Sequence, residues 1–275
     1  MARRTPRLAV VSAVLAAGLA FLSPGMASAG PGNGGQGLAQ DDPPIAPGAG
    51  WFPTTATPPA FFFGGVGSFN AEGPFTFASG APAVVSVTDD FARGDRFRVF
   101  DNAVALGDTT AVPVAPGPEV GPVAAYSDPA FSHESFLVAA GAHAITIQAI
   151  ASPFGAGRGY VRVDVCTVFG SGDLTGTNGN DVICGSPGPD RIAALDGDDL
   201  VFTFGGDDQI AVGAGADTVY AGTGNDKLSG ADGNDLLDAQ DGNDQLVAGP
   251  GVDTLHGGNG LDACVEGESV FTCEA

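Results

Sequence analysis

The sequence predicts an all-β protein in which an antiparallel β-sandwich is followed by a parallel β-roll of ten nonapeptides. Two observations carry this prediction. Residues 176–265 repeat with a period of nine, and such a period is typical of a solenoid. Residues 60–165 contain short β-branched or alternating runs between glycines and prolines, with no long stretch of helical apolar spacing.

The ten nonapeptides follow one another without insertion or deletion. The fourth position is always glycine: Gly179, Gly188, Gly197, Gly206, Gly215, Gly224, Gly233, Gly242, Gly251 and Gly260. The sixth position is always aspartate: Asp181, Asp190, Asp199, Asp208, Asp217, Asp226, Asp235, Asp244, Asp253 and Asp262. The eighth is Ile, Val or Leu nine times, from Ile183 to Leu255, and Cys264 in the last repeat.

This pattern predicts the path of the chain. Glycine at position four permits a positive φ and a sharp turn. Positions seven to nine then form a short strand, with the eighth side chain pointing inward and its neighbours outward. Two nonapeptides make one coil, so ten make five coils. Aspartates 18 residues apart therefore stack in two columns, one that begins at Asp181 and one that begins at Asp190.

The stacked carboxylates indicate a cation. Two of them at about 5 Å repel by roughly 3 kcal/mol at an effective dielectric constant near 20. One aliphatic side chain per nonapeptide offers little apolar burial to offset this repulsion. Calcium fits the columns best, because it accepts six to eight oxygen ligands, backbone carbonyls included, in tolerant geometry.

The repeats resemble those of the RTX family, whose consensus G-G-x-G-x-D-x-U-x binds calcium in a β-helix. The resemblance implies ions between same-edge turns, each held by turn carbonyls and two aspartates, and permits up to eight Ca²⁺. It implicates all ten aspartates, together with the glycines of the best-matching turns: Gly197, Gly206, Gly224, Gly233 and Gly242. Asp208/Asp226 and Asp226/Asp244 are expected to be the strongest sites.

Some turns depart from the pattern, and the terminal pairs of aspartates are expected to be the weakest sites. The departures are Pro187, Pro189, Pro250, Val252 and Leu261. A roll that binds few ions remains the alternative. An EF-hand is excluded, because its 12-residue loop, with glycine at six and glutamate at twelve, does not occur here.

The net charge of −22 is concentrated in the repeats. Residues 166–275 carry 20 acidic residues against Arg191 and Lys227. This charge argues against nucleic acid or an anionic membrane surface as partner.

Four cysteines bracket the acidic region and predict two disulfides. Three pairings are possible, and we favour the two local ones, Cys166 with Cys184 and Cys264 with Cys273. A cysteine-based metal site is disfavoured because no CxxC occurs.

The first 29 residues have the form of a signal peptide. Arginines at the start precede an apolar run from Leu8 to Leu22 and the site Ala27-Ser28-Ala29. The run is short for a membrane anchor, the competing interpretation. We therefore expect a secreted, extracellular protein without a transmembrane anchor after cleavage. Residues 30–59 are rich in Gly and Pro and indicate a linker.

Residues 60–165 are expected to form the sandwich of roughly eight strands. Predicted strands include 84–88, 96–100, 144–150 and 160–165. Segments such as Gly73-Pro74-Phe75-Thr76-Phe77 and Asp101-Asn102 resemble a group of secreted domains of unsettled function. Many such sandwiches bind extracellular carbohydrate or cell surfaces, so the resemblance implies a partner of that kind.

Asp89, Asp90, Asp95 and Asp101 admit two interpretations. They form a further calcium or sugar site, or they are solvated residues of turns and strand edges, which we favour.

No catalytic residue is assigned. His133-Glu134 lacks the second histidine of the zinc-protease signature H-E-x-x-H, and no G-x-S-x-G occurs. His133, His143 and His256 are scattered singly, as surface or strand residues. The sequence thus favours a non-catalytic, calcium-dependent binding or adhesion module. The alternative is a secreted hydrolase with an unrecognised site in the sandwich.

Overall fold

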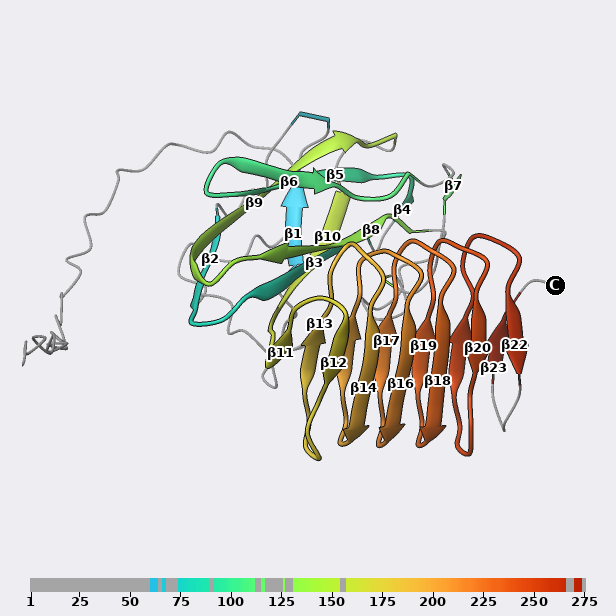
Figure 1. Ribbon diagram of the computed structural model, residues 1–275. Coiled ribbons are helices and arrows are strands. Elements are labelled where there is room, and N and C mark those ends of the chain that lie inside the picture. The colour runs from blue at the N-terminus through green and yellow to red at the C-terminus, as the bar shows by residue number, and fades with distance from the viewer. Residues whose placement is uncertain are drawn as a thin grey trace, which may run out of the picture. The chain divides into compact units, whose positions relative to one another are not determined.

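The computed structural model describes residues 60–63, 66–67, 74–89, 92–111, 115–116, 126, 131–153, 157–265 and 270–273. The expected signal peptide, the linker and Asp90 lie outside the described residues. All elements with described bounds are strands, which confirms the all-β prediction (Figure 1). In this part of the chain, no helix is long and apolar enough to cross a membrane.

The N-terminal part contains two four-stranded antiparallel sheets. The first has the order β1 (Ala60–Phe63), β10 (Gly157–Val165), β3 (Ala83–Asp89) and β8 (His133–Val138). The second has the order β2 (Phe75–Ser79), β9 (Gly141–Ala151), β5 (Arg96–Asp101) and β6 (Val104–Asp108). A short pair, β4 (Ala92–Arg93) and β7 (Ala115–Pro116), forms a separate sheet. Strands β3, β5, β9 and β10 confirm the four strands predicted here.

One apolar core joins the two sheets. It includes Val85 and Val161 from the first sheet and Phe97 and Ile147 from the second, all at most 1% exposed. In β9 every second residue from His143 to Ala149 is buried, as expected for a strand with one face on a core. The two sheets therefore pack face to face as a sandwich.

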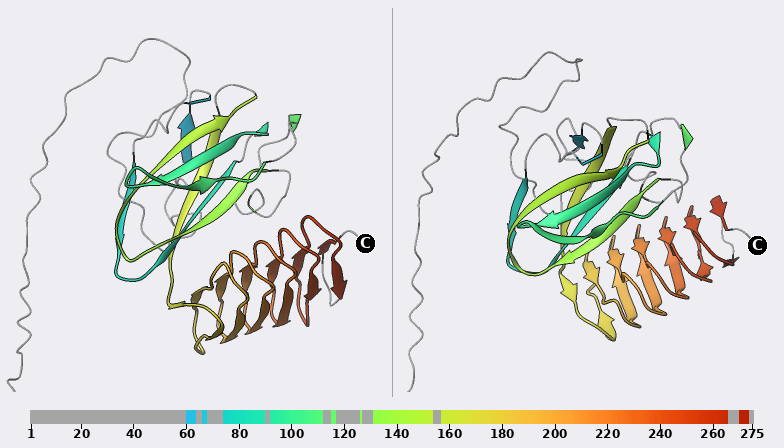
Figure 2. Two further views of the ribbon diagram at one scale, coloured as in Figure 1. Left: turned by 45° about the horizontal axis from the view of Figure 1, so that its top comes forward. Right: turned by 90° about the horizontal axis from the view of Figure 1, so that it is seen from above.

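The repeats form two parallel sheets that share one coiled path (Figures 1 and 2). One contains β11 (Val168–Phe169), β13 (Val182–Cys184), β15 (Leu200–Phe202), β17 (Thr218–Tyr220), β19 (Leu236–Asp238), β21 (Thr254–His256) and β23 (Val270–Thr272). The other contains β12 (Asp173–Thr175), β14 (Arg191–Asp196), β16 (Gln209–Ala214), β18 (Lys227–Asp232), β20 (Gln245–Val247) and β22 (Ala263–Val265). Partners such as Val201 and Val219 are 18 residues apart, which confirms two nonapeptides per coil.

The core of the roll is thin. The eighth residue of each repeat from Ile183 to Leu255 is at most 3% exposed, as predicted. The first position also points inward, for example at Ala194 and Val212, and the sequence pattern did not indicate this. Two small columns of side chains thus make up the interior.

The prediction that positions seven and nine point to solvent is wrong for part of the first roll sheet. Leu200, Phe202 and Tyr220 are buried in a second apolar cluster, which also includes Tyr126 and Tyr160. The aromatic residues at these positions have enough apolar area to make this burial favourable.

A positive φ and a close approach to the preceding coil both favour glycine at position four of the turns. Gly224 has a φ of +141°, and a Cβ on it would lie 1.9 Å from the carbonyl oxygen of Gly206 in the preceding coil. The second position is also left-handed in eight repeats, four of which lack glycine there: Leu195, Phe204, Ala231 and Gln240. Backbone hydrogen bonds between successive turns, such as Thr223 N–H to Phe204 O, hold these residues in the left-handed region.

Gly224→Ala should destabilise the roll by about 2–4 kcal/mol, because the new methyl meets backbone and not a movable side chain. The matched control is Gly179→Ala at the same repeat position, where the nearest atom is 3.9 Å away. Urea unfolding of both variants checks this. Equal midpoints for the two variants would contradict it.

Candidate metal centre

The repeat aspartates form two ladders of charge-assisted hydrogen bonds, one on each edge of the roll. In each ladder, Oδ1 of one aspartate accepts a hydrogen bond from the backbone N–H of the aspartate 18 residues before it. Asp208 N–H donates to Asp226 at 2.8 Å, and Asp226 N–H donates to Asp244 at 2.7 Å. Four such bonds occur on each edge, so the predicted stacking of the aspartates is confirmed.

The second carboxylate oxygen is left without a protein partner in most of these residues. Among the described residues, seven repeat aspartates have a buried Oδ2 that accepts no hydrogen bond: Asp199, Asp208, Asp217, Asp226, Asp235, Asp244 and Asp262. A buried polar atom without a partner is costly, and its regular recurrence requires an explanation. Oxygen atoms of this kind are the ligands that a hard cation accepts.

The first two repeats differ from those that follow. Oδ2 of Asp181 accepts hydrogen bonds from the N–H and the hydroxyl of Thr177, at 2.6 and 2.9 Å. Oδ2 of Asp190 accepts the same pair of bonds from Ser186. A hydroxyl-bearing residue at position two therefore satisfies the oxygen that most later repeats leave without a protein donor.

The pKa of Asp181 is shifted in the opposite direction from the pKa values of five later aspartates. Burial first, and then the charges of Asp208 and Asp244, raise the pKa of Asp226 to about 7. Burial likewise raises the pKa of Asp199, Asp208, Asp235 and Asp244 to about 6. Burial also acts to raise the pKa of Asp181, but hydrogen bonds from Thr177 and Thr167 outweigh it and lower this pKa.

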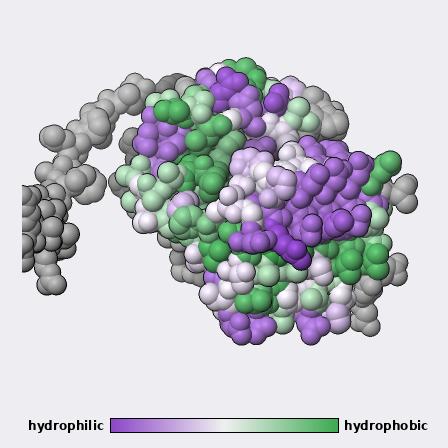
Figure 3. Space-filling view, viewed as in Figure 1, coloured by the Kyte–Doolittle hydropathy of each residue, from purple (hydrophilic) through white to green (hydrophobic). Residues whose placement is uncertain are grey.

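Position five carries a further ladder, in the opposite direction. There the N–H of the later residue donates to the side-chain oxygen of the earlier one, as from Asn243 to Asn225 at 3.1 Å. Val252 and Leu261 receive this support from Asn234 and Asn243. Ala216, Val252 and Leu261 have no side-chain oxygen, so Ala216 interrupts the ladder on one edge of the roll and Val252 and Leu261 end it on both edges in the last coil. Hydrophilic residues gather over the turns at one edge of the roll (Figure 3).

The cysteines form the two local disulfides favoured from the sequence. Cys166 is bonded to Cys184, and Cys264 is bonded to Cys273. The first joins the entry of the roll to β13, and the second ties the last repeat to the residue after β23.

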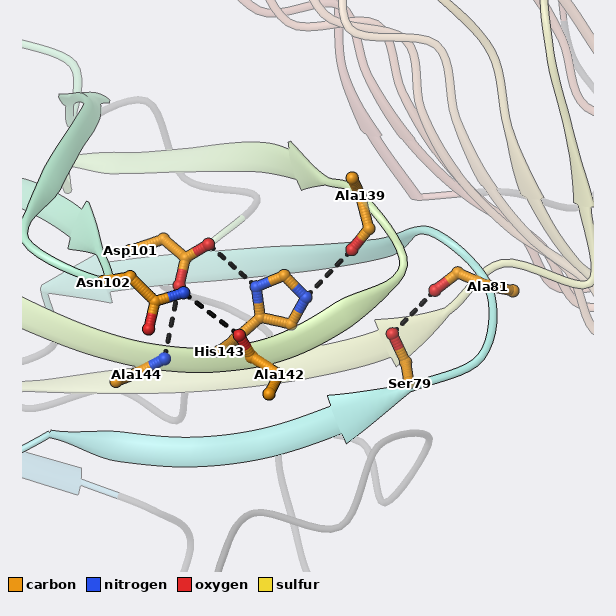
Figure 4. A network of polar contacts seen from close by, with 8 residues as sticks. All are labelled: Ser79, Ala81, Asp101, Asn102, Ala139, Ala142, His143 and Ala144. Carbon is orange, nitrogen blue, oxygen red and sulfur yellow. Dashed lines mark hydrogen bonds and ion pairs between the residues drawn. The ribbon is translucent and has the colours of Figure 1, made fainter. Parts of the chain in front are cut away.

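The acidic residues of the sandwich are not brought together as a metal site within the described part of the chain. Asp101 accepts hydrogen bonds from His143, at 2.8 Å, and from Ala144 N–H (Figure 4). Asp89 and Asp95 are at most 1% exposed, so the favoured interpretation of solvated residues is wrong for both. Burial raises the pKa of Asp95 to about 6, and a hydrogen bond with Ser152 partly opposes this. His133, His143 and His256 lie on β8, β9 and β21, as expected of strand residues.

Three or more His, Cys, Asp or Glu side chains converge nowhere in the described ranges. An ion between two aspartates of one edge therefore needs main-chain oxygens to complete its shell. That donor set agrees with a family model that matches residues 175–210, 202–237 and 229–264 in overlapping stretches, the model of the RTX calcium-binding nonapeptide repeat. Residues 175–264 are RTX calcium-binding repeats. The repeats thus identify calcium as the ligand of this region.

Comparison with solved structures gives only a loose likeness. The chain matches the catalytic domain of a GH87 α-1,3-glucanase bound to nigerose, with 10% identity and a TM-score of 0.23. It also matches a complex of that domain with tetrasaccharides, with 11% identity and a TM-score of 0.22. The matches cover 74% and 71% of this chain, but only 54% and 55% of the glucanase domain. No curated protein matches the chain.

Without calcium, the roll should be more stable near pH 5 than near pH 8. The fold raises the pKa of five RTX aspartates to about 6 or 7, above about 3.9 in an unfolded chain. The folded state therefore binds more protons between these values. The contribution of these five aspartates to stability is fully present below about pH 4 and is lost as pH rises through 6 to 7.

Urea unfolding in metal-free buffer at several pH values measures this dependence. In calcium the trend should reverse, because protons compete with the ion for the same oxygens. A metal-free roll whose unfolding midpoint rises from pH 5 to pH 8 would contradict the prediction.

Proposed function

We propose that this is a secreted, non-catalytic binding module whose RTX roll folds around calcium held by the two aspartate ladders. The observation that carries the proposal is the row of buried Oδ2 atoms without a protein partner. Unpaired anionic oxygens in the coils after the first disfavour the fold, and a cation between coils converts this cost into attraction.

Each ion would take Oδ2 atoms from two aspartates 18 residues apart and carbonyl oxygens from the two turns. All ten repeat aspartates are assigned to these ladders, with Gly197, Gly206, Gly224, Gly233 and Gly242 in the turns. Four intervals on each edge give up to eight Ca²⁺. Asp208/Asp226 and Asp226/Asp244 are the strongest sites, because Asp226 has the highest pKa of the ladder and two acidic neighbours.

The interval between Asp181 and Asp199 and that between Asp190 and Asp208 are assigned as the weakest. Thr177 and Ser186 already satisfy the oxygens of Asp181 and Asp190 that an ion needs. An ion there would have to displace these hydrogen bonds, so its net gain is smaller.

We assign the remaining parts of the chain from their sequence. Residues 1–29 are a signal peptide, 30–59 a linker, 60–165 a binding sandwich and 166–275 the calcium roll. The two disulfides fit an oxidising, extracellular compartment. The partner of the sandwich is assigned as extracellular carbohydrate or a cell surface.

Hydrogen exchange on the chain from residue 30 onward tests the role of calcium. Backbone amides of β13–β22 should exchange rapidly in chelator and become protected cooperatively as calcium rises to millimolar. Magnesium should not replace calcium, because it demands octahedral geometry and gives up water reluctantly. Amides of the sandwich provide the internal control. Equal protection of the roll amides from exchange in chelator, calcium and magnesium would contradict the proposal.

Two double variants of equal charge change test the order of the sites. Asp226→Asn with Asp244→Asn removes ligands from the strongest sites and should raise the calcium midpoint of protection about tenfold. Asp181→Asn with Asp190→Asn should leave it nearly unchanged. The estimate follows from about 1.4 kcal/mol of stabilisation per site at 1 mM calcium and a Kd near 10⁻⁴ M. Isothermal calorimetry on both variants gives the number of ions lost.

A further inference from the structure

The two basic residues of the roll lie in one column on one face. Arg191 begins β14 and Lys227 begins β18, both on the outer face of the second roll sheet. Gln209 lies between them and Gln245 follows, because all four occupy the seventh position of alternate repeats. All four side chains are exposed. Asp173, also exposed, is the register partner of Arg191 in the preceding coil. The column therefore presents a carboxylate, a cation, an amide, a cation and an amide in successive coils.

The two cations form no ion pair within the described part of the roll. In a region with 20 acidic residues, neither Arg191 nor Lys227 forms an ion pair with any described residue. The ladder carboxylates are buried at the turns, whereas the column stands on the flat sheet between them. Lys227 is thus available to an external anion, and Arg191 is available beside the exposed carboxylate of Asp173.

The side chains beside the column are small, so the surface there is shallow and open. Position nine of the same strands carries Ala193, Ala211 and Ser229, and these residues line one shallow groove together with the column. Small side chains let a flat ligand approach the sheet closely. No aromatic ring lines this groove, so stacking on a neutral sugar is not what the face offers.

We propose that this face binds one extended acidic polysaccharide along the roll, with its carboxylates on Arg191 and Lys227. The two cations are two coils apart, roughly 9.6 Å at the usual strand spacing. A partner with one carboxylate per two sugars in an extended chain matches this interval. The glutamine amides and the Ser229 hydroxyl between and beside the cations provide hydrogen bonds for sugar hydroxyls.

The affinity of this face for a polyanion rests on the proposed function, because it depends on bound calcium. Eight bound Ca²⁺ would offset sixteen of the eighteen net negative charges of residues 166–275. Without the ions, the field of the ladders repels any polyanion. Calcium therefore both orders the groove and permits the acidic ligand to approach.

Calorimetry with hyaluronan oligosaccharides, which carry one carboxylate per disaccharide, tests the site on the chain from residue 30 onward in millimolar calcium. Binding should weaken about tenfold in Arg191→Gln with Lys227→Gln, because two exposed ion pairs are lost. Gln209→Lys should strengthen it. Arg98→Gln, which removes an exposed cation of the sandwich, should leave it unchanged.

Dextran should not bind, and polyglutamate should bind much more weakly than hyaluronan. Equal binding by the wild type and the double variant, or polyglutamate binding as tight as that of hyaluronan, would overturn the site. Hydrogen exchange on the same samples separates the two proposals. A roll ordered without calcium that still binds hyaluronan removes the calcium function alone, whereas a calcium-ordered roll that does not bind it removes the polysaccharide site alone.

Discussion

Each coil of the roll is held to the next by an aspartate whose two oxygens have different roles. Oδ1 accepts a hydrogen bond from the main chain of the preceding coil and fixes the register. Oδ2 is buried with no protein donor in seven repeats among the described residues. The thin interior, two columns of small side chains, buries little apolar area to offset a column of such charges. The unpaired oxygens are of the kind that a hard cation accepts, in a region that matches the RTX calcium-binding repeat.

The repeats differ in how the second aspartate oxygen is satisfied. In the first two repeats, the hydroxyls of Thr177 and Ser186 donate to the Oδ2 atoms of Asp181 and Asp190. The adjoining disulfide between Cys166 and Cys184 adds a covalent link there. The first two repeats are thus stabilised by the protein's own atoms, whereas most later repeats leave the corresponding oxygen without a protein donor. Under the proposed function, dependence on calcium would increase from the first coil to the central coils.

The strictly repeated positions made much of this predictable. Glycine at four, aspartate at six and an aliphatic residue at eight were sufficient to predict the two-sheet coil, its 18-residue register and both aspartate columns. The left-handed second position was missed because Leu195, Phe204, Ala231 and Gln240 stand where glycine would have indicated it. The burial of Phe202 and Tyr220 was missed because the repeat alone does not show which face of the coil meets another apolar surface. Strands β11, β12 and β23 carry no repeat signature, so only the structure reveals them.

The last coil of the repeats has no side-chain oxygen at position five on either edge, whereas every earlier coil has at least one. A row of parallel coils with free strands at its end is a template on which another copy could continue the sheet. The N–H groups of Val252 and Leu261 donate to side-chain oxygens of the preceding coil, but their own side chains offer no oxygen to a following one. The bond between Cys264 and Cys273 closes the chain at the same place. A further coil, or another copy of the chain, stacked on this coil would therefore gain no side-chain hydrogen bond at position five.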